Sequence, residues 1–276
     1  MRFTKMQGIG NDYIYIDCFR ETVKDPAALS VRLSDRHFGV GSDGVILIEP
    51  SETADCKMDM YNADGSRGKM CGNGIRCVGK YVYERGIAQK NVLTVETQSG
   101  VKTLRLDVNG DKVGDIEVDM GRPVLKPAEI PADFPGDTVV GAPLRVGGKG
   151  YRVTCLSMGN PHCVVFVDET EHFPVEAVGP LFEHHPAFPE QVNTEFVQVL
   201  GKNEIKMRVW ERGSGETLAC GTGACASAVA CMLNGKTERS VRIHLRGGDL
   251  SIRWDESGNV MMKGPAEFSF DGTVEI

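Results

Sequence analysis

The chain has 276 residues, a formal net charge of −7 and 41% hydrophobic residues. This length fits one large domain or two smaller ones, the acidic charge argues against a broadly basic surface for nucleic acid, and the hydrophobic content excludes disorder. Glycine is abundant, with 33 residues and no collagen-like period, which indicates many turns between short elements.

Most of the predicted elements are short β-strands. In chain order they are expected at 13–17, 45–48, 92–97, 101–106, 116–119, 151–156, 163–167, 194–200, 205–210, 241–246, 250–254 and 260–263. Helices are predicted at 25–37, 75–85, 174–185 and 224–233, of which the last is apolar on every face, as a buried helix is. The stretch 121–150, rich in Pro and Gly, is expected to contain a join between two parts. Many strands around few helices predict an α+β fold with β-barrel-like or sandwich-like halves.

The nine cysteines are spread over the whole chain. Their odd number and wide spacing argue against a disulfide framework. The first residues include no apolar run of the kind found in signal peptides, and no segment approaches the ~20 apolar residues of a membrane span. We therefore expect a cytoplasmic protein with reduced thiols that binds neither membranes nor nucleic acid.

The two parts of the chain repeat one another at a fixed offset. Cys71-Gly-Asn-Gly74 and Cys220-Gly-Thr-Gly223 are 220 − 71 = 149 residues apart, and the glycines that end the following helical runs, Gly86 and Gly235, differ by the same 235 − 86 = 149. Agreement at separate motifs predicts an internal duplication. The same offset relates further pairs, namely Gly10-Asn11 with Gly159-Asn160, and Asn62 with Glu211.

Each cysteine of the repeated motif directly precedes a predicted helix. Unpaired backbone N–H groups and the helix dipole stabilise an anion there, so we expect them to lower the pKa of the Cys71 and Cys220 thiols toward neutrality. One thiolate could then remove the proton from one face of a Cα carbon while the other thiol supplies a proton to the opposite face. This is racemisation or epimerisation that needs neither a metal nor a pyridoxal cofactor. The backbone amides expected to hold a substrate carboxylate are those of Gly72, Asn73, Gly221 and Thr222.

Polar residues near both motifs suit an amino-acid-like substrate. Glu211 offers a carboxylate for an ammonium group, and Arg212 offers a guanidinium for a carboxylate. His162 could adjust the protonation of the thiols. Neutral hydrogen-bonding groups are expected from four asparagines, Asn11, Asn62, Asn160 and Asn193.

These motifs resemble those of the diaminopimelate epimerase family over essentially the full length of the chain. The matching segments include Met70-Cys-Gly-Asn-Gly-Ile-Arg-Cys77 and the stretches 5–12, 35–41, 61–66, 158–162 and 211–224. The resemblance implies that a small molecule, diaminopimelate, is the substrate, and that its LL and meso forms are interconverted in the synthesis of lysine and peptidoglycan precursors.

The resemblance also assigns roles to residues. It implies Cys71 and Cys220 as the acid–base pair, and His162 and Glu211 as residues that modulate them. Substrate contacts are implied for the backbone groups after each cysteine and for six side chains, those of Asn11, Asn62, Asn160, Asn193, Glu211 and Arg212.

The fold implied by the resemblance has two pseudo-symmetric β-barrel-like domains, each enclosing a helix, with the active site in the cleft between them. The expected boundaries are 1–120 for the first domain, completed by 266–276, and 121–265 for the second. Family members are commonly homodimers, which predicts a homodimer here. No metal site is expected, because the spacings around Cys71-x5-Cys77 and Cys220-x4-Cys225 are long for zinc ligands.

Gly44 departs from the family pattern, since many members have Gln at this position. By the 149-residue offset Gly44 corresponds to Asn193. We therefore expect that a side-chain contact to the substrate is absent here, and that water or the backbone replaces it or the far carboxylate is held differently.

The residues leave two alternatives open. The first is another amino-acid racemase on the same fold, such as a proline racemase, although that family generally has His where this chain has Asn73. The second is a non-catalytic amino-acid-binding protein, which would require only one of the two motif cysteines. The remaining cysteines are interpreted as ordinary buried residues: Cys18, Cys56, Cys77, Cys155, Cys163, Cys225 and Cys231.

Overall fold

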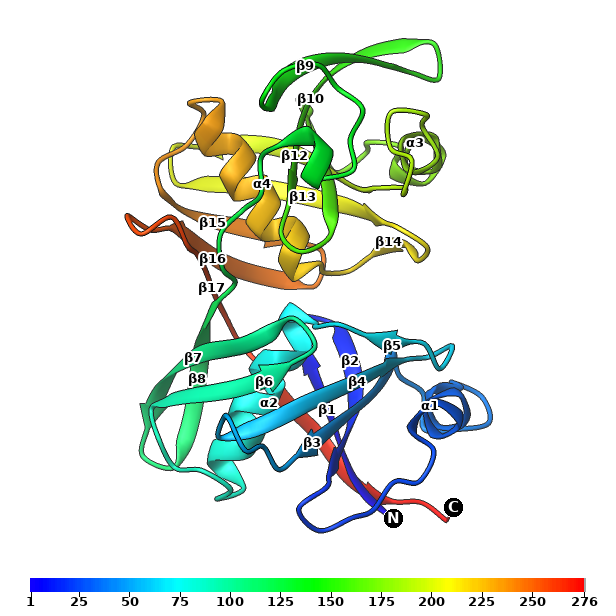
Figure 1. Cartoon of the computed structure of the whole chain (residues 1–276), viewed down its shortest axis with the longest axis vertical. Coiled ribbons are helices and arrows are strands. Elements are labelled where there is room, and N and C mark those ends of the chain that lie inside the picture. Colours follow the sequence, from blue (N-terminus) through cyan, green and yellow to red (C-terminus); the bar gives the residue numbers. More distant parts are fainter. Residues whose placement is uncertain (276) are drawn as a thin grey trace. The chain divides into compact units, whose positions relative to one another are not determined.

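The computed structural model describes residues 1–275, and the chain divides into two compact units. Unit 1 comprises Met1–Asp119 together with the segment that begins at Lys263, and unit 2 comprises Met120–Met262. In each unit, strands pack around one long helix, α2 (Gly72–Glu84) in unit 1 and α4 (Gly221–Leu233) in unit 2 (Figure 1). The predicted α+β class, with two β-barrel-like parts that each enclose a helix, is confirmed.

Unit 1 is built on one curved sheet. Its strands follow the order β18-β1-β2-β3-β4-β6-β7-β8, in which β2–β3 and β4–β6 are parallel and the other pairs from β18 to β8 are antiparallel. The small helix α1 (Pro26–Ser34) packs on β3 and β4. The strands are β1 (Arg2–Gly8), β2 (Asn11–Asp17), β3 (Gly44–Glu49), β4 (Cys56–Asn62), the short β5 (Arg67–Gly68), β6 (Val92–Thr97), β7 (Gly100–Asn109), β8 (Lys112–Asp119) and β18 (Glu267–Thr273).

Unit 2 repeats this arrangement. Its strands follow the order β9-β10-β11-β12-β13-β15-β16, with β11–β12 and β13–β15 parallel. The strands are β9 (Val139–Val146), β10 (Lys149–Ser157), β11 (Pro161–Phe166), β12 (Asn193–Gly201), β13 (Glu204–Glu211), the short β14 (Gly215–Thr217), β15 (Ser240–Leu245) and β16 (Gly248–Trp254), followed by β17 (Val260–Gly264) at the unit boundary. The other helices are η1 (Pro127–Glu129) and α3 (Val175–Glu183).

The 149-residue offset is present in the strand pairing itself. Ile14 pairs with Val45 in β2–β3, and Cys163 pairs with Thr194 in β11–β12. These pairs are equivalent, because 14 + 149 = 163 and 45 + 149 = 194. The enclosed helices α2 and α4 both have 13 residues and begin 221 − 72 = 149 residues apart. The duplicated sequence therefore folds into duplicated structure around the two motif cysteines.

Some elements differ from the prediction. Helix α1 ends at Ser34 rather than near residue 37, because the Asp35 carboxylate accepts hydrogen bonds from the amides of His37 and Phe38, each at 2.7 Å, and turns the chain. Strands β1, β4, β9 and β18 and the short strands β5 and β14 were not expected. Strand β9 lies in the Pro- and Gly-rich stretch 121–150 and pairs with β10, at a sheet edge where a proline such as Pro143 costs little.

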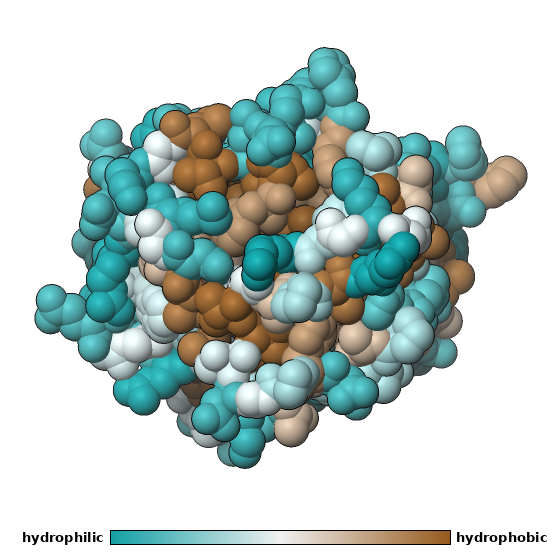
Figure 2. All heavy atoms as spheres, turned by 90° about the horizontal axis from the view of Figure 1, so that it is seen from above, coloured by the Kyte–Doolittle hydropathy of each residue, from teal (hydrophilic) through white to brown (hydrophobic). Residues whose placement is uncertain are grey.

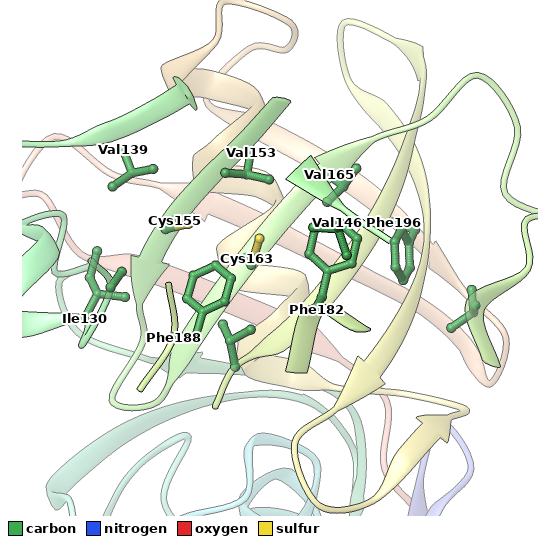
Figure 3. Packing of buried hydrophobic residues seen from close by; sticks show 13 residues of the cluster. Ile130, Val139, Val146, Val153, Cys155, Cys163, Val165, Phe182, Phe188 and Phe196 are labelled. Carbon is green, nitrogen blue, oxygen red and sulfur yellow. The ribbon is translucent and has the colours of Figure 1, made fainter. Parts of the chain in front are cut away.

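The apolar core of unit 2 includes two of the cysteines. Cys155 on β10 and Cys163 on β11 are register partners, and both are at most 1% exposed. They lie among apolar side chains that include Phe182, Phe188 and Phe196 (Figure 3). Their surroundings are those of ordinary core residues.

A few large apolar side chains stay exposed, for example Val140, Leu181 and Leu200, each between 38% and 48% exposed. The face drawn in Figure 2 shows apolar residues interrupted by hydrophilic ones, as is usual for a folded protein. Among the helices within residues 1–275, none has the length and apolar character needed to cross a membrane.

Candidate functional site

Both motif cysteines cap a helix. Cys71 and Cys220 have extended backbone and stand directly before α2 and α4, as predicted. The Cys71 Sγ accepts a hydrogen bond from the Gly74 amide at 3.3 Å, and the Cys220 Sγ accepts one from the Gly223 amide at 3.4 Å. Each sulfur is thus held at the positive end of a helix by one of the amides that has no partner inside the helix.

The second glycine of each motif lies in close contact with a side chain of the sheet. A Cβ atom on Gly74 would lie 2.6 Å from Ile46 Cδ1, and one on Gly223 would lie 2.7 Å from the Oε1 of Glu195. Ile46 lies on β3 and Glu195 on β12, the equivalent strands of the two units. The glycines therefore let each helix begin in contact with its sheet.

In unit 1 the structure brings Asn11 to Cys71. The Cys71 thiol donates to the Oδ1 of Asn11 at 3.2 Å, and the Asn11 Nδ2 donates to the carboxylate of Asp43 at 2.7 Å. Asn62 stands at the end of β4, where its Nδ2 donates to Ser66 Oγ at 2.9 Å. Asn73 is 2% exposed, so its side chain is enclosed and its predicted role is limited to the backbone.

Asp43, which sequence reasoning missed, orients Asn11. Burial raises the pKa of Asp43, and the neighbouring Asp12 raises it further. Burial also acts on Asp12, but hydrogen bonds from Arg36 and Lys5 outweigh it and lower the pKa of that carboxyl. Asp43 is 32 residues from Asn11 in the sequence, so this contact was not readable from the sequence alone.

In unit 2 a chain of hydrogen bonds leads from Cys220 into the core. Thr222 Oγ1 lies 3.5 Å from the Cys220 Sγ and accepts a bond from the Asn160 Nδ2 at 3.3 Å. The Asn160 Oδ1 lies 3.0 Å from the Nε2 of His162. The Nδ1 of His162 lies 2.7 Å from the Oε1 of Glu195, and both of these side chains are fully buried. His162 thus reaches the thiol through Asn160 and Thr222.

The other predicted residues of unit 2 form a second small network. The Asn193 side chain donates to the Pro161 carbonyl at 2.8 Å and accepts from the Arg212 amide at 3.0 Å. Glu211 accepts a hydrogen bond from Thr217 Oγ1 at 2.5 Å. The Arg212 side chain is exposed and donates to the Glu190 carbonyl at 2.9 Å. Asn193 therefore fixes the backbone at Arg212.

The expected lowering of the thiol pKa is wrong for Cys220. Burial raises the pKa of Cys220 well above its ordinary value, and the carboxylates of Glu211 and Glu195 add to the effect. The hydrogen bonds from Thr222 and from the Gly223 amide act in the opposite direction but are weaker. The sequence showed the helix start but not that this thiol is only 5% exposed.

The structure gives Gly44 a local packing role that the sequence did not show. A Cβ atom at this residue would lie 2.1 Å from the carbonyl oxygen of Tyr61 on the paired strand β4, and 2.8 Å from the ring of Tyr13. No side chain fits there without movement of the backbone. The backbone path of β3 beside β4 therefore requires a glycine at residue 44, whatever its relation to the substrate.

The arrangement can bind anions and move protons. Each thiol stands at the N-terminal end of α2 or α4, the kind of helix end that favours a bound carboxylate. No group of three or more His, Cys, Asp or Glu side chains within residues 1–275 is placed to hold a metal ion.

Several solved structures share this fold at low sequence identity. A Bacillus anthracis phenazine biosynthesis protein superposes with a TM-score of 0.72 at 17% identity, covering 100% of this chain and 99% of its own. A probable proline racemase from Agrobacterium radiobacter superposes with a TM-score of 0.71 at 14% identity, covering 100% of this chain and 93% of its own. At these identities the likeness concerns the fold alone.

Sequence relatives are much closer. The family model described as diaminopimelate epimerase matches residues 3–126 and 154–269. A diaminopimelate epimerase from Acetivibrio thermocellus is 55% identical, covering 100% of this chain and 99% of the relative. One from Methanococcus maripaludis is 49% identical and covers 100% of both chains. The chain therefore belongs to the diaminopimelate epimerase family.

Proposed function

We propose that this protein is an isomerase that interconverts LL- and meso-2,6-diaminoheptanedioate. The observation that carries the proposal is the equivalence of Cys71 and Cys220, each of which caps a helix and accepts a hydrogen bond from the third residue after it. One thiolate removes the proton from Cα, and the other thiol protonates the opposite face of the same carbon. No metal or cofactor takes part in this step.

The substrate is held by polar groups close to each sulfur. The amides of Gly72, Asn73, Gly221 and Thr222 bind the carboxylate next to the reacting carbon and stabilise the negative charge that develops there. Glu211 binds an ammonium group, and Arg212 binds a carboxylate. The remaining contacts come from Asn11, Asn62, Asn160 and Asn193. His162 and Glu211 modulate the cysteine pair.

The activity has a place in the cell that follows from its chemistry. Diaminopimelate is a precursor of lysine and of peptidoglycan, so we place the protein in the cytoplasm, where free thiols persist. We further propose that it works as a homodimer and contacts neither nucleic acid nor membranes. Within the chain, the two functional halves are proposed as 1–120, completed by 266–276, and 121–265.

A stereochemical assay tests the proposed function. Purified protein is incubated in D₂O with LL-diaminopimelate, proline, glutamate or aspartate, and each product is separated by chirality. We expect conversion and deuterium incorporation with diaminopimelate alone. Conversion of proline instead would identify a proline racemase-like enzyme, and binding of diaminopimelate without any exchange at Cα would identify a non-catalytic binding protein.

A further inference from the structure

The fully buried Glu195 is the inner end of the hydrogen-bond chain that leads to Cys220. The Asn160 Nδ2 donates to Thr222, so the atom that Asn160 presents to His162 is its Oδ1, which can only accept. The Nε2 of His162 must therefore carry a proton. The hydroxyl proton of Thr222 remains available to the Cys220 sulfur.

This geometry determines how many protons the buried pair holds. The 2.7 Å contact between His162 Nδ1 and Glu195 Oε1 requires one proton, either on the nitrogen or on the oxygen. In the first case an imidazolium faces a carboxylate, and in the second a neutral imidazole faces a carboxylic acid. The pair has no net charge in either case, and it differs only in where the proton lies.

The surroundings of Glu195 make it able to take up that proton. Its second oxygen, Oε2, is buried and has no hydrogen-bond partner among residues 1–275, so a full negative charge is poorly stabilised there. Burial accordingly raises the pKa of Glu195, although the adjacent His162 opposes this change. The charged or titratable groups near it are His162, Glu211, Cys163 and Cys220.

The duplication shows that this pair is specific to one half. By the 149-residue offset, His162 corresponds to Tyr13 and Glu195 to Ile46. The packing supports this equivalence. A Cβ atom added to the second motif glycine would meet Ile46 in unit 1 and Glu195 in unit 2. The Cys71 half thus has an aromatic and an aliphatic residue where the Cys220 half has a pair that shares a proton.

We propose that Glu195 is a positioning residue for Cys220, which shares one proton with His162 and releases it to His162 whenever Cys220 becomes a thiolate. When Cys220 gives its proton to the substrate carbanion, the shared proton moves from Glu195 Oε1 to His162 Nδ1. The resulting imidazolium polarises Asn160 and Thr222 toward the sulfur. When the thiolate takes a proton from Cα, the shared proton returns to Glu195, and the pair is neutral overall at both stages.

This role rests on the proposed function, in which Cys220 is one of two bases. It also reduces the electrostatic cost of forming the Cys220 thiolate. The thiolate of Cys220 would otherwise form in a buried site beside Glu211 and Glu195. A lone Glu195 carboxylate would repel that thiolate, whereas a Glu195 carboxylate that faces the His162 imidazolium belongs to a pair without net charge. If Glu195 only repels the thiolate, removing its carboxylate should make Cys220 easier to deprotonate. If Glu195 shares a proton with His162, removing it should make Cys220 harder to deprotonate.

The test places Glu195→Gln in two backgrounds, Cys71→Ala and Cys220→Ala. In each background only one thiol can remove a Cα proton, so loss of the Cα–H signal in D₂O, followed by NMR between about pH 6 and 9, reports on that thiol alone. We expect Glu195→Gln to slow exchange by Cys220 at least about tenfold at neutral pH and to raise the pH of half-maximal exchange. Exchange by Cys71 should change less than about twofold.

Several results would overturn the role of Glu195. Faster exchange by Cys220, or a lower pH of half-maximal exchange, would mean that Glu195 merely repels the thiolate. Equal losses in both backgrounds, or no loss, would also contradict the proposal. Glu84→Gln is the matched control, because Glu84 is a buried carboxylate at the opposite end of α2 that accepts from Lys112 and the Val113 amide.

A second measurement is independent of activity. In ¹⁵N-histidine-labelled protein, the His162 ring signals are assigned as those missing from His162→Gln. We expect a protonated Nε2 and a Nδ1 that shares its proton in the parent, and an ordinary neutral imidazole in Glu195→Gln. A parent His162 whose Nδ1 has the signal of a free imidazole nitrogen, neither protonated nor hydrogen-bonded to Glu195, would refute the shared proton even if Glu195→Gln does not fold. Failure of the proposed function would give a different result. In that case neither Cys71→Ala nor Cys220→Ala would exchange the Cα proton of one diaminopimelate stereoisomer in preference to the other.

Discussion

Cys71 and Cys220 hold equivalent places in the two units, 149 residues apart, and the sulfur of each accepts a hydrogen bond from the backbone amide three residues later, at 3.3 and 3.4 Å. The start of each helix thus holds its sulfur by one backbone hydrogen bond. We expect the two 13-residue helices to persist without the sulfur, at the cost of a lost cap.

Replacing either sulfur should separate activity from stability. We expect Cys71→Ala and Cys220→Ala each to reduce epimerisation by about 10³-fold or more, since an essential proton-transfer group is lost. The free energy of unfolding should fall by only about 1 kcal/mol, the usual cost of losing a helix cap. Initial rates and urea unfolding measure the two effects. Cys231→Ala, at a fully buried cysteine in the last turn of α4, is the control and should retain activity. Comparable losses in the control would point to folding rather than chemistry.

Substitution of Gly44 should destabilise unit 1. Both Gly44→Ala and Gly44→Gln add a Cβ atom that would lie only 2.1 Å from the carbonyl oxygen of Tyr61. We expect each to lower the free energy of unfolding by about 1–3 kcal/mol or more, as overpacked sites do. Gly201→Ala is the control, because a Cβ there meets no atom within 4 Å. A Gly44→Gln protein as stable as its parent would show that β3 can move aside.

Arg76 should be a major contributor to the stability of unit 1. It is fully buried, and its guanidinium donates to the Pro265 carbonyl at 3.0 Å and to the Gly72 carbonyl at 3.2 Å, which ties the first turn of α2 to the segment before β18. Arg76→Met keeps an unbranched, flexible side chain, although a shorter one, and leaves these carbonyls without their donor. We expect a loss of about 2–4 kcal/mol, measured by urea unfolding.

Arg85→Met provides the comparison for Arg76. Arg85 forms an exposed ion pair with Asp271 at 2.8 Å, and exposed pairs contribute about 1 kcal/mol or less. If the two variants lose similar amounts of stability, the buried contacts of Arg76 are not important.

His244 should make stability depend on pH. Its ring lies 2.7 Å from both Glu204 and Asp249, and the hydrogen bond to Glu204, supported by Asp249, raises the pKa of His244. The charged form is thus favoured in the folded state. Its contribution is fully present below the unfolded-state pKa, about 6.5, and is lost as the pH rises through the higher folded-state pKa.

The difference in unfolding free energy between the parent and His244→Gln measures this contribution. We expect it to be larger near pH 5.5 than near pH 9, by no more than about 1 kcal/mol because the group is partly exposed. A difference that grows with pH would have the wrong sign for this ion pair.

The sequence predicted the positions of the motif cysteines because the Cys-Gly-x-Gly pattern has a local meaning, a capping side chain followed by residues that permit close approach. It also predicted most strands from their apolar runs. Strands β1 and β4 were missed because buried or paired charges, such as Lys5, Lys57 and Asp59, interrupt those runs.

Glu195 was missed for a related reason. In an alternating strand it would face solvent, but β12 contacts both α3 and α4, so both of its faces are covered. The pKa of Cys220 likewise depends on enclosure by strands that are distant in sequence. One signal was present, namely an acidic residue directly before an apolar pair, Phe196-Val197, in the half that also carries His162.

The central claim is that two different thiols handle the proton that leaves and the proton that arrives. Its most direct test is the location of deuterium after a short incubation of unlabelled LL-diaminopimelate with the parent enzyme in D₂O. The account predicts deuterium at Cα of the inverted product and protium in the recovered substrate. A product that keeps the original protium would mean that one base returns the same proton, which would contradict the roles assigned to Cys71 and Cys220.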